Sequence, residues 1–470
     1  MSRIHTISSI LVLLVCVSMA GCRTNNTYGV IPPSNGNSSV VLAMTDNPPS
    51  LVSILSAQVT LTGATLTPGN VSLFSGSTTV DLMRLQTDIA YLSTAANIPA
   101  GNYTAVNLTF ANPKLTIEND MGTTIAGCAV GAICPIVPIA TPLSATIPLT
   151  AFSIAANSTT GLLIDVNLDN LLSASLGEDF SVGTTVTPFT PAGTGAPSVG
   201  AEDIVGQIGN VTPSSKTFTL TNVTGTHSLK VDNSSTFFQF PNSACSTPGF
   251  GCLQNNQILS VDIGILSDGS ILARNILFED ADSGDTEVEG MITGTNLGMQ
   301  QFNIVIQTMS APVSGLSIGL PITVQYSASP QTPFDVDFVH GDSTQISTSG
   351  FLFAVPTDLT VGQQISIRRH STLPGGQVLA DRVRLRSSRI TAPQTIGSGI
   401  VSLSGLPSIF SGHGVIGIQA QTSLPTIFFE IGHIINISDI PPNTPVSVRG
   451  PLFNASGTTR PMIATKVVLK

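Results

Sequence analysis

The sequence predicts an all-β protein, in which an N-terminal β-sandwich is followed by three small β-barrel-like repeats. Short runs of alternating apolar and polar residues, bounded by Gly, Pro and Asn, are typical of half-buried strands, and residues 57–62 and 103–110 are two examples. Charged residues make up only 9% of the 470 residues, which is too few for coiled coils or long amphipathic helices. A degenerate internal repeat occupies the C-terminal half of the chain, as described below.

The charge balance limits the partners that the protein can have. The formal net charge is −10, which argues against nucleic acid as a partner because nucleic-acid binding needs a basic face. Apolar residues make up 41% of the chain, which argues against an intrinsically disordered protein of the highly charged kind.

The N-terminus has the layout of a secretory signal. Arg3 supplies a positive charge, residues 10–17 form an apolar run, and small residues lead into Cys22. The Ala-Gly-Cys ending resembles a bacterial lipobox, which implies cleavage before Cys22 and attachment of diacylglycerol to its thiol. We therefore expect a lipoprotein signal peptide at 1–21 and a flexible tether at 22–39, with the alternative of an ordinary signal cut after Ala20 or Gly21. The expected location is the outer membrane, facing the periplasm or the cell surface.

Four further cysteines form two close pairs, which are Cys128 with Cys134 and Cys245 with Cys252. In an exported protein we interpret them as local disulfides. A metal site is the alternative, but both spacings are wider than those of common zinc knuckles.

Residues 40–189 carry the predicted sandwich, with one or two short helical turns expected within 87–96 and 167–176, and three landmark motifs. They are Thr45-Asp46-Asn47-Pro48, Val80-Asp81-Leu82 and Pro99-Ala100-Gly101-Asn102-Tyr103. Together they resemble the bacterial domain of unknown function 4382, although Asn47 stands where that family usually has Ala. The resemblance implies an exported, often lipid-anchored domain without an assigned activity. We interpret Asp46 and Asp81 as residues that cap turns, and Tyr103 as a packed core residue.

A linker at 190–202 precedes three predicted repeats at 203–280, 287–390 and 396–470. Each repeat is expected to open with a Gly-containing strand, around Gly206, Gly290 and Gly399. The repeats resemble the domain of unknown function 5666, an envelope module that likewise has no settled activity. Because the chain is long enough for several cores, we expect the units to fold independently.

An acidic run from 279 to 289 joins the first two repeats. Asp280, Asp282 and Asp285 could donate three carboxylates to a Ca²⁺ ion that bridges the repeats. The alternative is a solvated linker, because the order of residues is not that of an EF-hand.

A cluster of arginines lies in the second repeat, and some of its members alternate along one predicted strand face. This face could bind anionic lipid headgroups or an acidic polysaccharide, could simply be solvated, or could pair with the acidic run. The residues predicted for an anionic ligand are Arg368, Arg369, Arg382, Arg384 and Arg386.

Catalytic patterns are weak. Residues 315–319 match Gly-x-Ser-x-Gly around Ser317, but a strand follows where a nucleophile elbow needs a helix. We therefore predict a non-catalytic, lipid-anchored envelope protein with a binding or spacing role, whose partners are the membrane and other envelope proteins or surface glycans. The alternatives are a secreted hydrolase or polysaccharide-processing accessory, and a calcium-dependent adhesin.

Overall fold

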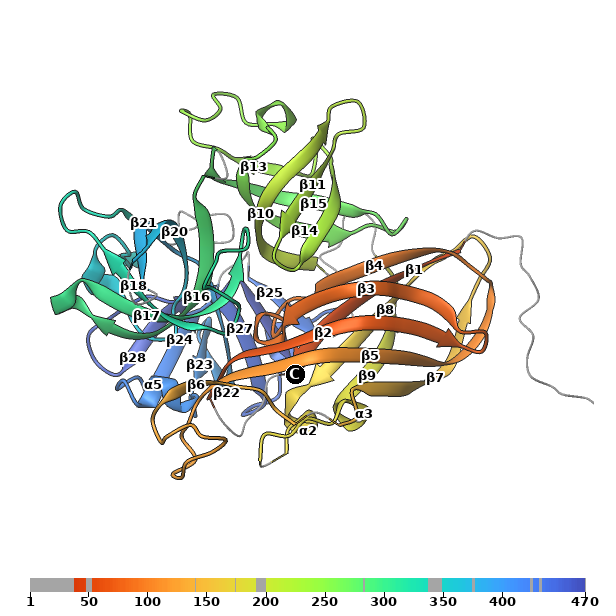
Figure 1. The fold of residues 1–470 in the computed structure, drawn as a ribbon, viewed down its shortest axis with the longest axis horizontal. Coiled ribbons are helices and arrows are strands. Elements are labelled where there is room, and N and C mark those ends of the chain that lie inside the picture. The colour runs from red at the N-terminus through yellow and green to blue at the C-terminus, as the bar shows by residue number, and fades with distance from the viewer. Residues whose placement is uncertain are drawn as a thin grey trace, which may run out of the picture.

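The chain folds into a sandwich and three barrel-like units, all built from β-strands (Figure 1). The computed structural model describes residues 38–47, 53–139, 141–173, 175–191, 200–281, 284–336, 349–373, 377–422, 426–430 and 433–469. The predicted signal, Cys22, the tether up to residue 37 and Asp282 lie outside these ranges. Within them, no helix has the length and apolar character needed to cross a membrane. The predicted all-β class is confirmed.

The sandwich consists of two sheets that face each other across a core in which alternate strand residues are buried. One sheet has the order β4-β1-β8-β9, with β1 (Ser38–Asn47), β4 (Ala90–Ile98), β8 (Thr159–Asn167) and β9 (Thr184–Phe189). The other has the order β3-β2-β5-β6, and β7 also pairs with β5; its strands are β2 (Ser53–Thr67), β3 (Val71–Asp81), β5 (Gly101–Glu118), β6 (Ile133–Ile136) and β7 (Ser144–Ile154). Three single-turn helices complete the unit, namely η1 (Leu82–Arg84), α2 (Leu168–Leu171) and α3 (Phe180–Gly183).

The first barrel has the strand order β12-β11-β10-β14-β15-β13, and it closes because β12 also pairs with β15. Its elements are β10 (Gly200–Thr212), β11 (Thr217–Asn222), β12 (Gly225–Val231), β13 (Phe237–Gln239), η2 (Phe250–Cys252), β14 (Ile258–Ile265) and β15 (Ile271–Asp280).

The second barrel repeats this arrangement as β18-β17-β16-β20-β21-β19, with closure between β18 and β21. Its elements are β16 (Thr286–Asn296), η3 (Leu297–Met299), β17 (Gln301–Met309), β18 (Pro321–Tyr326), β19 (Phe334–Val336), η4 (Pro356–Asp358), β20 (Gln364–Thr372) and β21 (Val378–Leu385).

In the third barrel the final strand is divided into two pieces. Strand β28 pairs with β24 and strand β29 pairs with β25 and β27, as single strands do in the other barrels. Its elements are β22 (Ser387–Gly397), β23 (Ile400–Leu403), α5 (Ser408–Ser411), β24 (Gly417–Gln421), β25 (Ile427–Glu430), β26 (His433–Ile434), η5 (Ile437–Asp439), β27 (Pro445–Pro451), β28 (Thr459–Ile463) and β29 (Lys466–Leu469).

The third barrel opens with β22, ahead of residue 396 where the sequence repeat was placed. Gly206 and Gly290 lie inside opening strands, and a Cβ on either would come within 3 Å of a carbonyl oxygen of the next strand. Cross-strand pairing puts Ala392 at the corresponding place in β22. Gly399 instead occupies the turn after β22, where its φ of 76° favours glycine. The glycine predicted to open the third repeat is therefore a turn residue, whereas the glycines that open the first two repeats lie within strands.

Apolar cores cross the boundaries between the four units. Val41 and Leu163 of the sandwich pack in the core of the first barrel, and Leu55 packs in that of the third. Phe453 and Ile463 of the third barrel belong to the core of the second. Because separating the units would expose this surface, we expect them to unfold together, contrary to the expectation of independent folding.

Candidate functional site

A short segment of the sandwich, residues 82–88, lies where the three barrels meet, and we call it the central segment. Asp81 fixes its start: the carboxylate accepts hydrogen bonds from Ser56 Oγ at 2.6 Å, Ala57 N at 3.0 Å and Met83 N at 3.1 Å. Asp81 thereby caps helix η1, as its interpretation as a turn cap required. Burial raises the pKa of Asp81, and these hydrogen bonds oppose the increase.

Arg84 of the central segment joins the first and second barrels. Its Nη1 lies 2.7 Å from Glu289 Oε2 of the second barrel, and its Nη2 donates to the Asp203 carbonyl oxygen of the first barrel at 2.8 Å. Burial raises the pKa of Glu289, and Arg84 works against that increase.

Asp88, at the other end of the central segment, binds the third barrel. Its carboxylate lies 2.7 Å from Arg389 Nη2, 3.3 Å from Lys466 Nζ and 3.9 Å from Arg449 Nε. Burial alone would raise the pKa of Asp88, but the three cations outweigh it and lower the pKa to about 2. Asp88 is therefore ionised at neutral pH although it is buried.

Corresponding positions in the three barrels carry charged or polar residues at the contacts between barrels. Each barrel contributes one residue from its opening strand, which is β10, β16 or β22. It also contributes two residues that face each other across a later pair of strands, β14 with β15, β20 with β21, or β27 with β29. The residues are acidic or neutral in the first barrel, mixed in the second and basic in the third: Asp203, Asp262 and Asn275; Glu287, Arg368 and Arg382; Arg389, Arg449 and Lys466. The opposite charges allow the first and third barrels to contact each other, with Arg449 Nη2 at 2.7 Å from Asp203 Oδ2.

Three of the five arginines predicted to face an anionic ligand converge on Glu279 at the end of β15. Arg382 Nη2 lies 2.6 Å and Arg384 Nη1 2.9 Å from Glu279 Oε2, and Arg386 contacts Oε1. Glu279 and Arg386 have fully buried side chains. Burial would raise the pKa of Glu279, but the arginines lower it to about 2. The acidic run therefore pairs with the arginine face inside the molecule, which was one of the alternatives raised by the sequence.

The other two arginines lie on β20. Arg368 Nη1 is 3.3 Å from Asp280 Oδ2, and its Nε is 3.9 Å from Asp285 Oδ2. Arg369 is half-buried and stands opposite Thr286 of β16. Of the carboxylates proposed for Ca²⁺, those of Asp280 and Asp285 lie among the described residues, and both face the guanidinium group of Arg368.

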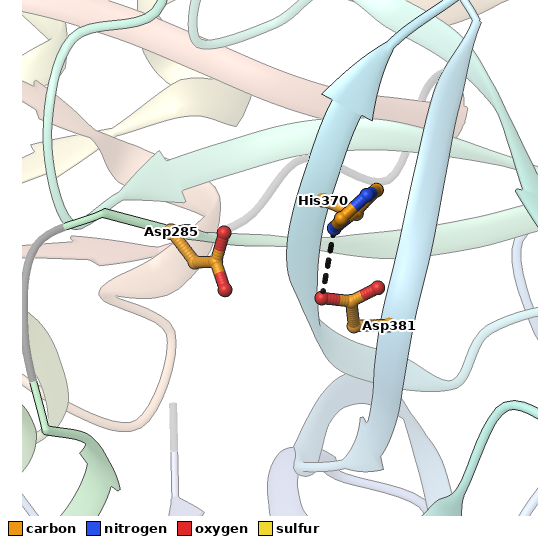
Figure 2. A group of neighbouring side chains, drawn as sticks. All are labelled: Asp285, His370 and Asp381. Atoms are coloured by element: carbon orange, nitrogen blue, oxygen red, sulfur yellow. Dashed lines mark ion pairs between the residues drawn. The ribbon is translucent and has the colours of Figure 1, made fainter.

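One group of side chains near this point has the spacing of metal ligands (Figure 2). Ligand atoms of Asp285, His370 and Asp381 all lie within 4.8 Å of one another, and His370 Nδ1 is 3.3 Å from Asp381 Oδ2. Imidazole is not a preferred ligand of Ca²⁺. Arg368 Nε lies 4.0 Å from Asp381 Oδ2, so a fixed positive charge already faces the carboxylates. The group fits an ion-pair cluster better than a calcium site.

Both predicted disulfides are present, and each has a Cα–Cα distance of 5.8 Å. Cys128–Cys134 ties the loop before β6, and Cys245–Cys252 ties the chain around η2.

The Gly-x-Ser-x-Gly pattern has a structural role at the boundary between the sandwich and the second barrel. Ser317 is exposed in the connection from β17 to β18 and precedes a strand. The neighbouring carbonyl oxygens of Ile318 and Gly319 accept hydrogen bonds from Gln58 Nε2 at 2.8 Å and Thr116 Oγ1 at 2.5 Å. A Cβ on Gly319 would lie 2.4 Å from that Gln58 nitrogen, so the glycine allows the loop to dock.

Several junction residues were missed by the sequence analysis. They are single charges, or in one case one of two adjacent acids, within otherwise uncharged stretches, and their partners are distant in sequence: Arg84, Asp88, Asp203, Arg449 and Lys466. In a chain with 9% charged residues, a lone charge inside a strand pattern was the available signal.

Comparison with known proteins concerns the sandwich. Residues 37–180 match the family model of the Domain of unknown function (DUF4382). The match contains Asp81 and the central segment, and it supports the interpretation of the N-terminal domain. No curated protein matches the chain.

Proposed function

We propose that the protein is a non-catalytic, lipid-anchored bacterial envelope protein that acts as a rigid binding or spacing body at the outer membrane or cell surface. The observation that carries this proposal is the buried ion-pair junction around the central segment. Arg84 and Asp88 connect the sandwich to all three barrels, and hydrogen bonds between buried groups hold each connection in one geometry. A body fixed in this way presents its exposed loops in a constant arrangement.

The anchor is supported by the sequence around Cys22. A positively charged start, an apolar run and the Ala-Gly-Cys ending precede the β-rich body. The two disulfides suit the oxidising compartment to which such a signal leads.

The test compares the full-length chain with Cys22→Ser and with the matched control Cys16→Ser, each expressed in a Gram-negative host. We expect the unmodified chain and the Cys16→Ser control in the membrane fraction, with Cys22→Ser released into the soluble exported fraction. Membrane retention of Cys22→Ser, or release of the unmodified chain, would contradict the lipid anchor. Protease treatment of intact cells then separates a surface location from a periplasmic one.

A further inference from the structure

A groove lies between the edge of the sandwich and the first barrel. In Figure 1 this barrel lies above β3 and β4. Its volume is about 440 Å³, and its walls come from β3, β4, β11, β12 and the turn between β14 and β15. A second cavity of about 100 Å³ shares Thr78, Tyr91, Thr224 and His227 with it and extends to the central segment. The groove is in the size range of small-molecule sites, roughly 300–1,000 Å³.

The walls of the groove are rich in hydroxyl groups and poor in charge. Eight of the residues that line it are Ser or Thr, and Tyr91 adds a ninth hydroxyl. None of its lining residues carries a carboxylate, and its cation, Lys230, lies 3.1 Å from Asp268 Oδ2. Several of these hydroxyl groups already donate to protein acceptors, among them those of Ser93, Thr94 and Thr224. Their oxygen atoms can still accept, so these walls suit an uncharged ligand that donates hydrogen bonds.

Two rings from different units form part of the wall. Tyr91 of the sandwich and His227 of the first barrel meet edge to face, with ring centroids 5.9 Å apart and an interplanar angle of 77°. The Tyr91 hydroxyl donates to Thr94 Oγ1 at 3.0 Å, which fixes the ring. Burial lowers the pKa of His227, so this imidazole is neutral at neutral pH. The rings provide an uncharged amphipathic surface.

Strand edges border the same groove. Strands β3 and β4 each lie at the edge of a sandwich sheet, and β12 pairs with β15 only at Lys230 and Val231. The backbone along these edges offers further N–H and C=O groups to a polar ligand.

We propose that this groove binds a neutral saccharide of about two sugar units. Sugar hydroxyls match the hydroxyl-lined walls, and the edge-to-face pair of Tyr91 and His227 adds aromatic surface to the lining for the apolar side of a sugar ring. An anionic ligand would need a cation that is not already paired, whereas an added peptide strand would need pockets for alternate side chains. The inference rests on the binding role proposed above, but it does not depend on the lipid anchor.

The test uses the full-length protein in a detergent without a sugar headgroup. Binding of maltose, cellobiose and N,N′-diacetylchitobiose at millimolar concentration is measured by calorimetry and by saturation-transfer NMR, with a uronic-acid disaccharide and a Thr/Val hexapeptide for comparison. We expect at least one neutral disaccharide to bind, His227→Ala to weaken it by about tenfold, and the control His413→Ala, an exposed His in the third barrel, to leave it unchanged.

Three results would overturn the inference. They are absence of binding by all three neutral disaccharides, binding restricted to the uronic-acid disaccharide or the peptide, and binding that His227→Ala leaves intact. The unfolding midpoint of His227→Ala is measured in parallel; if this variant is destabilised, Ser228→Val on the exposed face of β12 replaces it with the same expectation. Cell fractionation remains a separate measurement, so failure of the anchor and failure of saccharide binding are distinguishable.

Discussion

Replacing Asp88 by Asn removes one negative charge from the junction and keeps the shape of the side chain. The side chain of Asp88 is 3% exposed and contacts three cations, which are Arg389, Lys466 and Arg449. The substitution removes the carboxylate that neutralises part of their positive charge. The pKa of Asp88 falls from its ordinary 3.8 to about 2 in the folded protein. At about 1.4 kcal/mol for each pKa unit, this corresponds to roughly 2–3 kcal/mol of stability.

Breaking a buried ion pair from one side costs about 3–5 kcal/mol in other proteins, so both arguments give a loss of about 3 kcal/mol. The assay is equilibrium unfolding in urea at pH 7 for the unmodified chain, Asp88→Asn and Asp268→Asn. Asp268 pairs with Lys230 at the surface with 57% of its side chain exposed, so we expect a change of about 0.5 kcal/mol or less for that control.

The sign of the pH dependence provides a second check. Because the folded state lowers the pKa of Asp88, its contribution is complete above about pH 4 and is lost as the pH falls toward about 2. The two proteins should therefore converge in stability at low pH. A loss of less than about 1 kcal/mol at pH 7 would refute the reasoning that Asp88 holds the third barrel to the sandwich.

Three further predictions concern other parts of the molecule. Glu178 Oε2 has no hydrogen-bond partner among the described residues, and burial raises the pKa of Glu178 to about 8. The free energy of unfolding should therefore fall as the pH rises from about 4.5 through 8. Glu178→Gln should reduce this fall when unfolding is compared at pH 5 and pH 9. Gly290→Ala would place a Cβ 2.3 Å from the Val305 carbonyl oxygen and should lower the unfolding midpoint, whereas Gly298→Ala, whose nearest neighbour is 3.9 Å away, should not. Millimolar Ca²⁺ should leave the thermal midpoint unchanged because Arg368 already faces Asp280 and Asp285, and an upward shift would favour the adhesin alternative.

Local pattern was enough to predict the strands of the sandwich and the packing of Tyr103, whose hydroxyl donates to the Pro99 carbonyl oxygen at 2.7 Å. It failed where tertiary pairing decides the conformation. Residues 87–96 were expected to include a short helical turn, but β4 begins at Ala90 because this segment pairs along β1. The start of the third barrel was misplaced because Ala392 replaces the glycine used to align the repeats.

The junction was harder to predict than the fold, because its contacts join residues far apart in the chain. Asp88 and Lys466 are 378 residues apart, and Arg84 and Glu289 are 205 apart. No local period or spacing encodes such a pair. The clustering of arginines and of acids was visible in the sequence, but their mutual pairing depends on how the first and second barrels contact each other.

The distribution of charge over the three barrels explains why they assemble in one order. Corresponding positions carry acids in the first barrel and cations in the third, so a first barrel in the place of the third would bring Asp203 and Asp262 against Asp88 instead of Arg389 and Arg449. Like charges buried together cost several kcal/mol, whereas opposite charges offset the cost of each other's burial and fix the geometry of the contact. Because the three units share a strand order and have similar apolar cores, apolar packing alone would not determine which unit occupies which place. The few charges of this chain therefore specify which unit occupies which place around the central segment.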